Sequence, residues 1–163
     1  AKRIGFILQE PFLFTGSLLD NVFYGNELYA DKTDEEKATA LKDSSMQNLL
    51  MRFDGGLEAQ INGSGEGMSL GQKQLIAFMR AVLREPELLI LDEATANIDT
   101  VTEQLLEETL KALPSKTAKV IIAHRLNTIE SADEIFFVNA GEITPAGSLE
   151  KAVELLMSGK RAS

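Results

Sequence analysis

Two adjacent carboxylates, Asp92 and Glu93, directly follow the uninterrupted aliphatic run at residues 88–91. Such a run predicts a strand buried on both faces, as in a parallel sheet. Open α/β sheets bind ligands in the crevice beyond the carboxyl ends of their strands. An Asp at that edge is suited to hold Mg²⁺, and a Glu beside it to accept a proton from water. A core strand that ends in two solvated acids explains these six residues equally well.

A second candidate group lies at the predicted start of a long helix, at Ser69 and Gly71. Ser69 and Gln72 form the Ser-x-x-Gln pattern of a capping box, which is a sufficient structural explanation. The small residues Gly67 and Gly71 also leave backbone N–H groups open at the positive end of the helix dipole, where phosphates bind. Capping and phosphate binding are compatible, and both place Ser69 at the helix N-terminus.

Three further polar residues stand at the ends of predicted elements: Gln9, Asp99 and His124, the single histidine of the chain. Each has a structural explanation when it is taken alone. Gln9 terminates a strand, Asp99 caps a helix, and His124 is a hydrogen-bonded structural residue at a strand end. A functional interpretation of these residues therefore depends on their order along the chain.

Strands alternating with helices are predicted to position these side chains. The predicted strands cover residues 3–8, 88–91, 120–123 and 134–138, and the last of them enters a hairpin turn at 139–142. Helices are predicted from Ser17 to near Gly25, from a capping box at Thr33, over 46–53, 70–84, 100–112 and about 126–131, and from Ser148 to about Met157. Residues 57–67 are glycine-rich and predict a loop.

Composition narrows the class of protein. A chain of 163 residues with 44% hydrophobic and 25% charged residues is typical of one globular domain with a substantial core. A net charge of -9 argues against a nucleic-acid partner, because binding to phosphate backbones needs basic surface. The absence of cysteine excludes disulfides and thiolate metal sites and suits a cytoplasmic setting. No apolar run approaches the length of a membrane span, and no signal peptide is visible.

The loop Phe12-Leu13-Phe14 is too apolar for an ordinary surface connection. Two explanations are open: a small satellite core beneath the loop, or a docking surface for another protein.

The features described so far occur in a distinctive order. A strand-end Gln precedes a helical insertion, a Ser-x-Gly-Gln helix start, an aliphatic strand ending in Asp-Glu, a turn ending in Asp and a strand-end His. In this order the chain resembles the nucleotide-binding domain of ATP-binding-cassette (ABC) transporters, from Arg3 to about Met157. The resemblance implies an α/β fold: a partial P-loop NTPase (RecA-like) parallel sheet with an inserted α-helical ABC signature subdomain.

The resemblance also implies a role for each matching residue, with ATP and Mg²⁺ as cofactors. The implied catalytic residues are Glu93, which polarises water, His124, which senses the γ-phosphate, and Gln9 of the Q-loop, which contacts Mg²⁺ and the attacking water. Asp92 matches the Walker B aspartate, a metal ligand. The implied nucleotide-binding residues are Ser69, Leu70, Gly71 and Gln72 of the signature motif, with Asp99 of the D-loop. Met68 and Leu70 depart from the usual Leu-Ser-Gly-Gly-Gln signature, but Ser69 and Gly71 are kept, so we expect binding to survive.

Residues 9–22 resemble the exporter branch of the family. The resemblance then implies that Phe12-Leu13-Phe14 meets the coupling helices of a transmembrane domain, at the cytoplasmic face of a membrane. It further implies that a second ABC ATPase domain binds head-to-tail, so that Ser69 and Gly71 meet ATP held by the partner.

No Gly-x-x-x-x-Gly-Lys-Ser/Thr phosphate loop and no upstream adenine-stacking aromatic occur in these residues. We therefore expect the chain to be the C-terminal two-thirds of an ABC domain, with a Q-loop strand and loop (1–16), a helical signature subdomain (17–84), and a Walker B, D-loop, H-loop and C-terminal part (85–163). Alone it should be nearly inactive. A missing neighbouring strand would expose an edge at residues 119–123, which predicts self-association or rearrangement of the last strands.

The resulting functional prediction is an ATPase domain that drives export, with the transported substrate and the homo- or heterodimeric state left open. Two alternatives remain at this point. One is a soluble ABC-type ATPase of DNA repair or translation, against which the acidic charge and the exporter-like residues 9–22 argue. The other is a short, non-catalytic module that binds a partner ATPase, which would have no chemical need for Glu93 and His124.

Overall fold

A computed structural model describes residues 4–7, 11–92, 98–123 and 129–159 of the chain. These residues divide into two compact units, 1–122 and 123–163, which are described separately. The expectations for Gln9, Glu93 and His124 lie outside the described residues.

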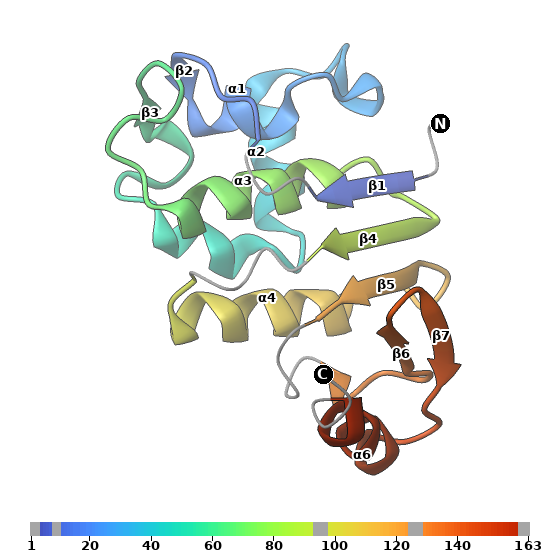
Figure 1. Cartoon of the computed structure of the whole chain (residues 1–163). Helices are drawn as coiled ribbons and strands as arrows, with labels where there is room; N and C mark the ends of the chain where they lie inside the picture. The colour runs from blue at the N-terminus through green and yellow to red at the C-terminus, as the bar shows by residue number, and fades with distance from the viewer. Residues whose placement is uncertain (1–3, 8–10, 93–97, 124–128, 160–163) are drawn as a thin grey trace. The chain divides into compact units, whose positions relative to one another are not determined.

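The first unit is built on a three-stranded parallel sheet of β1 (Ile4–Ile7), β4 (Leu88–Asp92) and β5 (Ala118–Ile122) (Figure 1). The strand order is β1-β4-β5, so the acid-bearing strand β4 lies in the middle. Ile7 pairs with Leu91 in one ladder, and Leu91 pairs with Ile121 in the other. The predicted parallel sheet is therefore confirmed, with Asp92 at the carboxyl end of its central strand.

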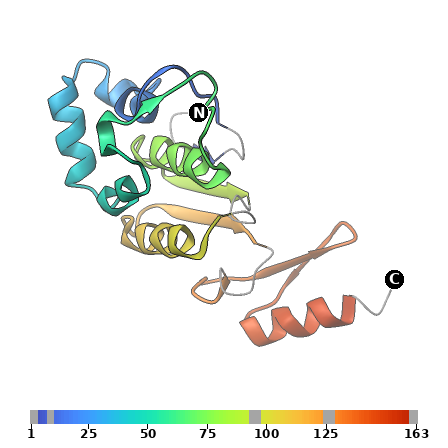
Figure 2. The ribbon, with the colours of Figure 1, turned by 90° about the vertical axis from the view of Figure 1, so that its left-hand side faces the viewer.

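The helices α3 (Leu70–Val82) and α4 (Thr100–Ala112) cover the same face of this sheet (Figure 2). Each helix connects two neighbouring parallel strands, and such connections are right-handed. Because both connections advance in the same direction across the sheet, the two helices lie on the same face. Leu89 and Leu91 point into this layer and are buried.

The opposite face of the sheet corrects the prediction of strands buried on both faces. There Phe6 pairs with Ile90, and Ile90 with Val120. Phe6 and Val120 are 51% and 48% exposed, and Ile90 is half-buried. The strand β5, predicted to be buried, is largely exposed, since among the described residues it pairs with β4 alone.

Between β1 and α3 the chain forms the predicted helical insertion. The helices α1 (Leu18–Phe23) and α2 (Asp34–Lys42) start at complete capping boxes, Ser17 with Asp20 and Thr33 with Glu36. The short strands β2 (Gly16–Ser17) and β3 (Gln60–Ile61) pair antiparallel and tie the two ends of the insertion together. This pair was not predicted. Two short 3₁₀ helices, η1 (Glu27–Tyr29) and η3 (Gly56–Glu58), complete the insertion.

The segment predicted as a helix over 46–53 is instead the 3₁₀ helix η2 (Gln47–Arg52). Its predicted apolar residues are buried all the same, including Met46, Leu49 and Phe53. The segment is confined between a turn at Ser44, whose hydroxyl accepts the Met46 N–H at 3.1 Å, and the left-handed Gly55 at φ 89°. A run this short favours the tighter i→i+3 helix.

The long helix α3 ends at Val82, two residues before its predicted end at residue 84. In the connection from α3 to β4, Glu85 takes a positive φ of 48°. The buried residues of α3 include Leu75 and Met79, which join Leu89 and Leu106 in the core of the first unit. Packing of α3 and α4 on the sheet thus places the N-terminus of α3 beside the turn that precedes α4.

The second unit contains the hairpin of β6 (Phe136–Asn139) and β7 (Glu142–Pro145), followed by α6 (Leu149–Gly159). Ala140 and Gly141 form its turn with φ of 50° and 83°, as a two-residue type I′ hairpin requires. The hydroxyl of Ser148 accepts the Lys151 N–H at 3.2 Å, which confirms the predicted cap of the last helix. The first half of the predicted helix at about 126–131 lies outside the described residues.

Candidate functional site

The signature residues lie at the N-terminus of α3, as the sequence predicts. The Gln72 N–H donates to Ser69 Oγ at 3.1 Å, and the Ser69 N–H donates to Gln72 Oε1 at 3.0 Å. This reciprocal capping box holds Ser69 on the surface, while Gly71 is buried against the protein. The first N–H groups of a helix have no partner within it, so this end of a thirteen-residue helix has donors and dipole charge suited to a phosphate.

Gly71 lies against the turn that precedes α4. A Cβ placed on Gly71 would stand 3.7 Å from Cγ1 of Ile98 and 3.7 Å from Ser69 Oγ. Ile98 is itself 7% exposed and belongs to the core. The structure therefore brings the signature motif and the turn at Ile98 and Asp99 together, although they are far apart in sequence.

Asp99 is the N-cap of α4. Its carboxylate accepts the Thr102 N–H at 3.1 Å and the Thr102 hydroxyl at 2.7 Å. These hydrogen bonds, the hydroxyl first, lower the pKa of Asp99 below its ordinary value of 3.8, and the charge of Arg52 acts in the same direction. Asp99 is therefore an ionised capping residue, as its local sequence predicts.

Arg52 is the residue near the site that the sequence analysis missed. Its Nη2 lies 2.9 Å from each carboxylate oxygen of Asp99. The backbone oxygen of Arg52 accepts Gln72 Nε2–H at 2.9 Å. Arg52 thus contacts both the signature motif and the cap of α4, and no local sequence pattern indicates this because its partners are distant in the chain.

Asp92 is the last residue of β4, at the carboxyl ends of the strands. It is exposed there and pairs with Ile122 of β5. An exposed carboxylate at this position fits one oxygen ligand of a hard cation such as Mg²⁺. Within the part of the chain that the structure describes, no three His, Asp or Glu side chains come together as a metal cluster. Gln9 and Glu93, expected beside Asp92, are outside that part.

Part of the loop Phe12-Leu13-Phe14 is buried in the main core, not in a separate satellite core, and part of it is exposed. Leu13 is 3% exposed and belongs to the main core, whereas Phe12 is 66% exposed. The rings of Phe12, Phe14 and Tyr24 form an aromatic cluster, with centroids separated by 6.3, 6.0 and 5.1 Å. The guanidinium of Arg80 lies 5.6 Å from the Tyr24 ring centroid, so a cation–π contact fixes one side of the cluster.

Side chains of Asn21 and Arg80 form hydrogen bonds with the backbone that carries this aromatic cluster. Buried Asn21 donates to the Phe14 carbonyl at 3.0 Å and accepts the Phe14 N–H at 3.2 Å. Arg80 donates to the carbonyls of Phe12 and Asn21. Side-chain hydrogen bonds therefore fix the backbone that carries the Phe12 and Phe14 rings.

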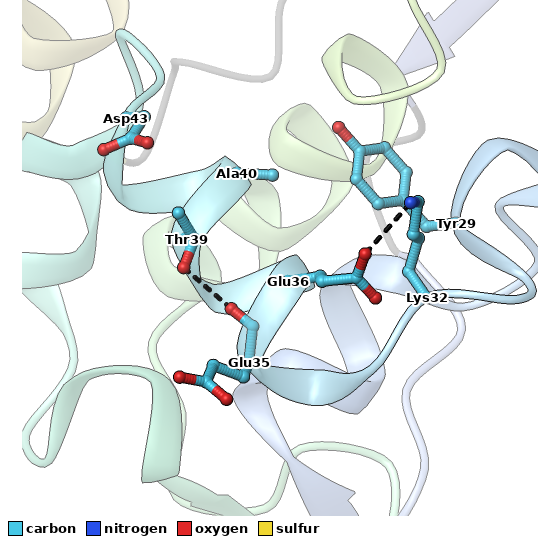
Figure 3. A pocket seen from close by; sticks show the side chains of 7 residues that line it. All are labelled: Tyr29, Lys32, Glu35, Glu36, Thr39, Ala40 and Asp43. Carbon is cyan, nitrogen blue, oxygen red and sulfur yellow. Dashed lines mark hydrogen bonds and ion pairs between the residues drawn. The ribbon is translucent and has the colours of Figure 1, made fainter.

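A surface hollow lies on α2 and the residues just before it (Figure 3). It is lined by Tyr29, Lys32, Glu35, Glu36, Thr39, Ala40 and Asp43. Lys32 pairs with Glu36 at 3.0 Å, and the Thr39 hydroxyl donates to the Glu35 carbonyl at 2.9 Å. None of the predicted site residues lines this hollow, so we do not assign the site to it.

A parallel sheet with a capped signature helix, an aspartate at the end of the central strand and a helical insertion defines the class of nucleotide-binding ABC ATPase domains. A model of the family "ABC transporter" matches residues 1–96 of the chain. The chain belongs to this family, and it is an ATP-binding domain of the exporter type.

Named relatives support the assignment. An uncharacterized ABC transporter ATP-binding protein of Bacillus subtilis, YfiC, is 45% identical over 93% of this chain and 25% of its own length. A fatty acid ABC transporter ATP-binding/permease protein of Mycobacterium tuberculosis is 38% identical over 90% of this chain and 23% of its own length. A bacterial Atm1-family ABC exporter, solved with ATP bound, has a TM-score of 0.70 and 30% identity over 96% of this chain and 26% of its own.

The chain therefore spans about a quarter of the length of these relatives. The two relatives named as ATP-binding/permease protein and exporter are membrane transporters. In this chain, no helix among the described residues is both long and apolar enough to cross a membrane.

Proposed function

We propose that this chain hydrolyses ATP with Mg²⁺ as part of an exporter, at the cytoplasmic face of a membrane. One observation carries the proposal: the capped, open N-terminus of α3 at Ser69 lies against the turn at Ile98 and Asp99. The signature motif and the D-loop residues Ile98 and Asp99 thereby lie side by side and form one surface. Two such domains bound head-to-tail would enclose ATP between this surface and the phosphate loop of the partner.

Each residue of the site has a role in this proposal. Ser69 donates its hydroxyl hydrogen to the γ-phosphate, and Leu70 and Gly71 supply backbone N–H groups. Gln72 forms the capping box that orients them. Glu93 accepts a proton from the attacking water.

The remaining residues hold the phosphate and the metal. His124 positions the γ-phosphate, and Asp92 and Gln9 hold Mg²⁺, which when bound neutralises charge on the phosphates. Asp99 completes the surface that faces the partner.

The proposal also assigns a surface to the membrane-spanning partner. We propose that the exposed cluster of Phe12, Phe14 and Tyr24 receives the coupling helices of a transmembrane domain. Its support is an ordered group of large aromatic side chains, two of which are more than half exposed. Nucleic acid is not a partner in this proposal, given the net charge of -9.

The expected division of the chain at residues 16/17 and 84/85 remains part of the proposal. The lack of a phosphate-loop motif in these 163 residues predicts that the chain alone turns over ATP very slowly. Such a loop supplies the Lys and the backbone N–H groups that bind most of the phosphate charge.

The test is Mg-ATP turnover by the chain alone and by the chain joined to a phosphate-loop segment from an ABC transporter relative. Turnover that requires the added segment and disappears in Glu93→Gln supports the proposal. Turnover by the chain alone that is lost in Glu93→Gln would show that other residues bind the phosphates. No turnover in either form, with both folded, would contradict the proposal.

A further inference from the structure

We propose that Arg52 is a positioning residue, which fixes the signature motif and the D-loop of one domain as a single rigid surface. The inference rests on the proposed function, because it concerns how the two halves of the ATP-facing surface are held together. Arg52 lies in η2 of the helical insertion, and it belongs to neither motif.

The proposal starts from two contacts made by opposite ends of the same residue. The side chain of Arg52 places Nη2 2.9 Å from both oxygens of Asp99. Its backbone oxygen accepts Gln72 Nε2–H at 2.9 Å. Because Gln72 Oε1 also accepts the Ser69 N–H, a continuous series of hydrogen bonds runs from Ser69 through Gln72 and Arg52 to Asp99.

A third contact closes this series into a ring. Gly71 faces the Ile98 side chain, at 3.7 and 3.8 Å from an added Cβ to Cγ1 and Cγ2. The apolar contact limits the distance between the two motifs, and the Arg52 hydrogen bonds limit their rotation. Two motifs joined in this way move together.

Capping alone does not require the arginine. Asp99 already has the Thr102 N–H and hydroxyl as partners for the start of α4. The Arg52–Asp99 pair is partly exposed, with side chains 35% and 51% accessible, and such pairs contribute little to stability. We expect the pair to matter more for geometry than for stability, since groups that face a reacting phosphate must be held within about 0.5 Å of their productive positions.

Arg52→Gln tests the proposal, with Arg52→Lys as the conservative variant and Lys32→Gln as the matched control. Lys32 makes an ion pair with Glu36 at 3.0 Å in the same helical insertion, and neither residue belongs to either motif. In the complete transporter, Arg52→Gln should lower kcat for Mg-ATP about tenfold with KM changed less than about twofold. Arg52→Lys should restore part of kcat, and Lys32→Gln should match the wild type.

A second readout does not depend on ATP. Amide hydrogen exchange of the present chain without nucleotide reports on the Ser69 and Thr102 N–H groups, which lie at the two ends of the series. Arg52→Gln should accelerate exchange at both, whereas Lys32→Gln should change neither. If the transporter does not hydrolyse ATP but both amides respond, the proposed function fails and the mechanical link stands.

Two results would overturn the link itself. One is faster exchange at Thr102 alone, which would make Arg52 a local partner of the cap. The other is wild-type kcat in Arg52→Gln, or a loss of kcat that only follows a lower Tm and is equalled by Lys32→Gln.

Discussion

Arg52 and Asp99 lie 47 residues apart in sequence, yet one guanidinium nitrogen of Arg52 contacts both carboxylate oxygens of Asp99 at 2.9 Å. The contact joins the helical insertion to the first turn of α4. Through Gln72 it also reaches Ser69, so the residues proposed to face ATP are supported by a residue outside the family motifs.

Ser69→Ala separates the capping role of Ser69 from its proposed phosphate contact. Loss of the cap should lower the free energy of unfolding by about 1 kcal/mol, measured by urea denaturation. The loss of ATP turnover in the complete transporter should be much larger than this destabilisation explains. Ser69→Thr keeps a hydroxyl and should retain most of both properties, and equal losses of turnover in the two variants would contradict the phosphate contact.

Asp99 should make stability depend on pH in the acidic range. Hydrogen bonds from the Thr102 hydroxyl and N–H hold the pKa of folded Asp99 below 3.8, so the unfolded chain takes up the proton first as pH falls. The stabilising contribution is complete above about pH 4 and is lost as pH falls through the lower folded pKa. The difference in unfolding free energy between wild type and Asp99→Asn should therefore shrink as pH falls below about 4.

Repeating the pH series at high salt distinguishes the Thr102 hydrogen bonds from the Arg52 charge as the cause of this pH dependence. Because the Thr102 hydrogen bonds are the largest cause of the lowered pKa and the Arg52 charge is a smaller one, 1 M NaCl should leave most of the effect in place. Disappearance of the effect in salt would show that the ion pair dominates.

Phe12 and Leu13 are adjacent, but substitution of Leu13 should lower stability, whereas substitution of Phe12 should affect transport instead. Leu13→Ala removes a side chain that is 3% exposed and should cost about 2–5 kcal/mol in chemical denaturation. Phe12→Ala removes one that is 66% exposed and should change stability by less than about 0.5 kcal/mol. In the complete transporter, Phe12→Ala should uncouple ATP turnover from transport, and full coupling in that variant would argue against the proposed docking surface.

The strand β5 predicts association between copies of this chain. Among the described residues it pairs with β4 alone, and Val120 and Ile122 are 48% and 47% exposed. An unpaired strand edge with apolar neighbours is a template for a second strand. Sedimentation velocity over a concentration series should show self-association that weakens in Val120→Lys, and a monomer at every concentration would refute the prediction.

Local patterns in the sequence determined much of this structure. The caps at Ser17, Thr33, Ser69 and Asp99 form as predicted, because each depends on a side chain and a backbone group three residues away. The aliphatic run before Asp92 also formed the predicted parallel strand, although only Leu89 and Leu91 of the run are fully buried.

Only the tertiary structure decided which of these elements touch. Nothing near Arg52 in sequence indicates Asp99 as its partner, and nothing near Gly16 indicates its pairing with Ile61. The same holds for the exposed face at Phe6 and Val120, because sequence reports that a side chain is apolar but not whether a helix covers it. Contacts between distant residues depend on how whole elements pack, and a local pattern contains no information about that packing.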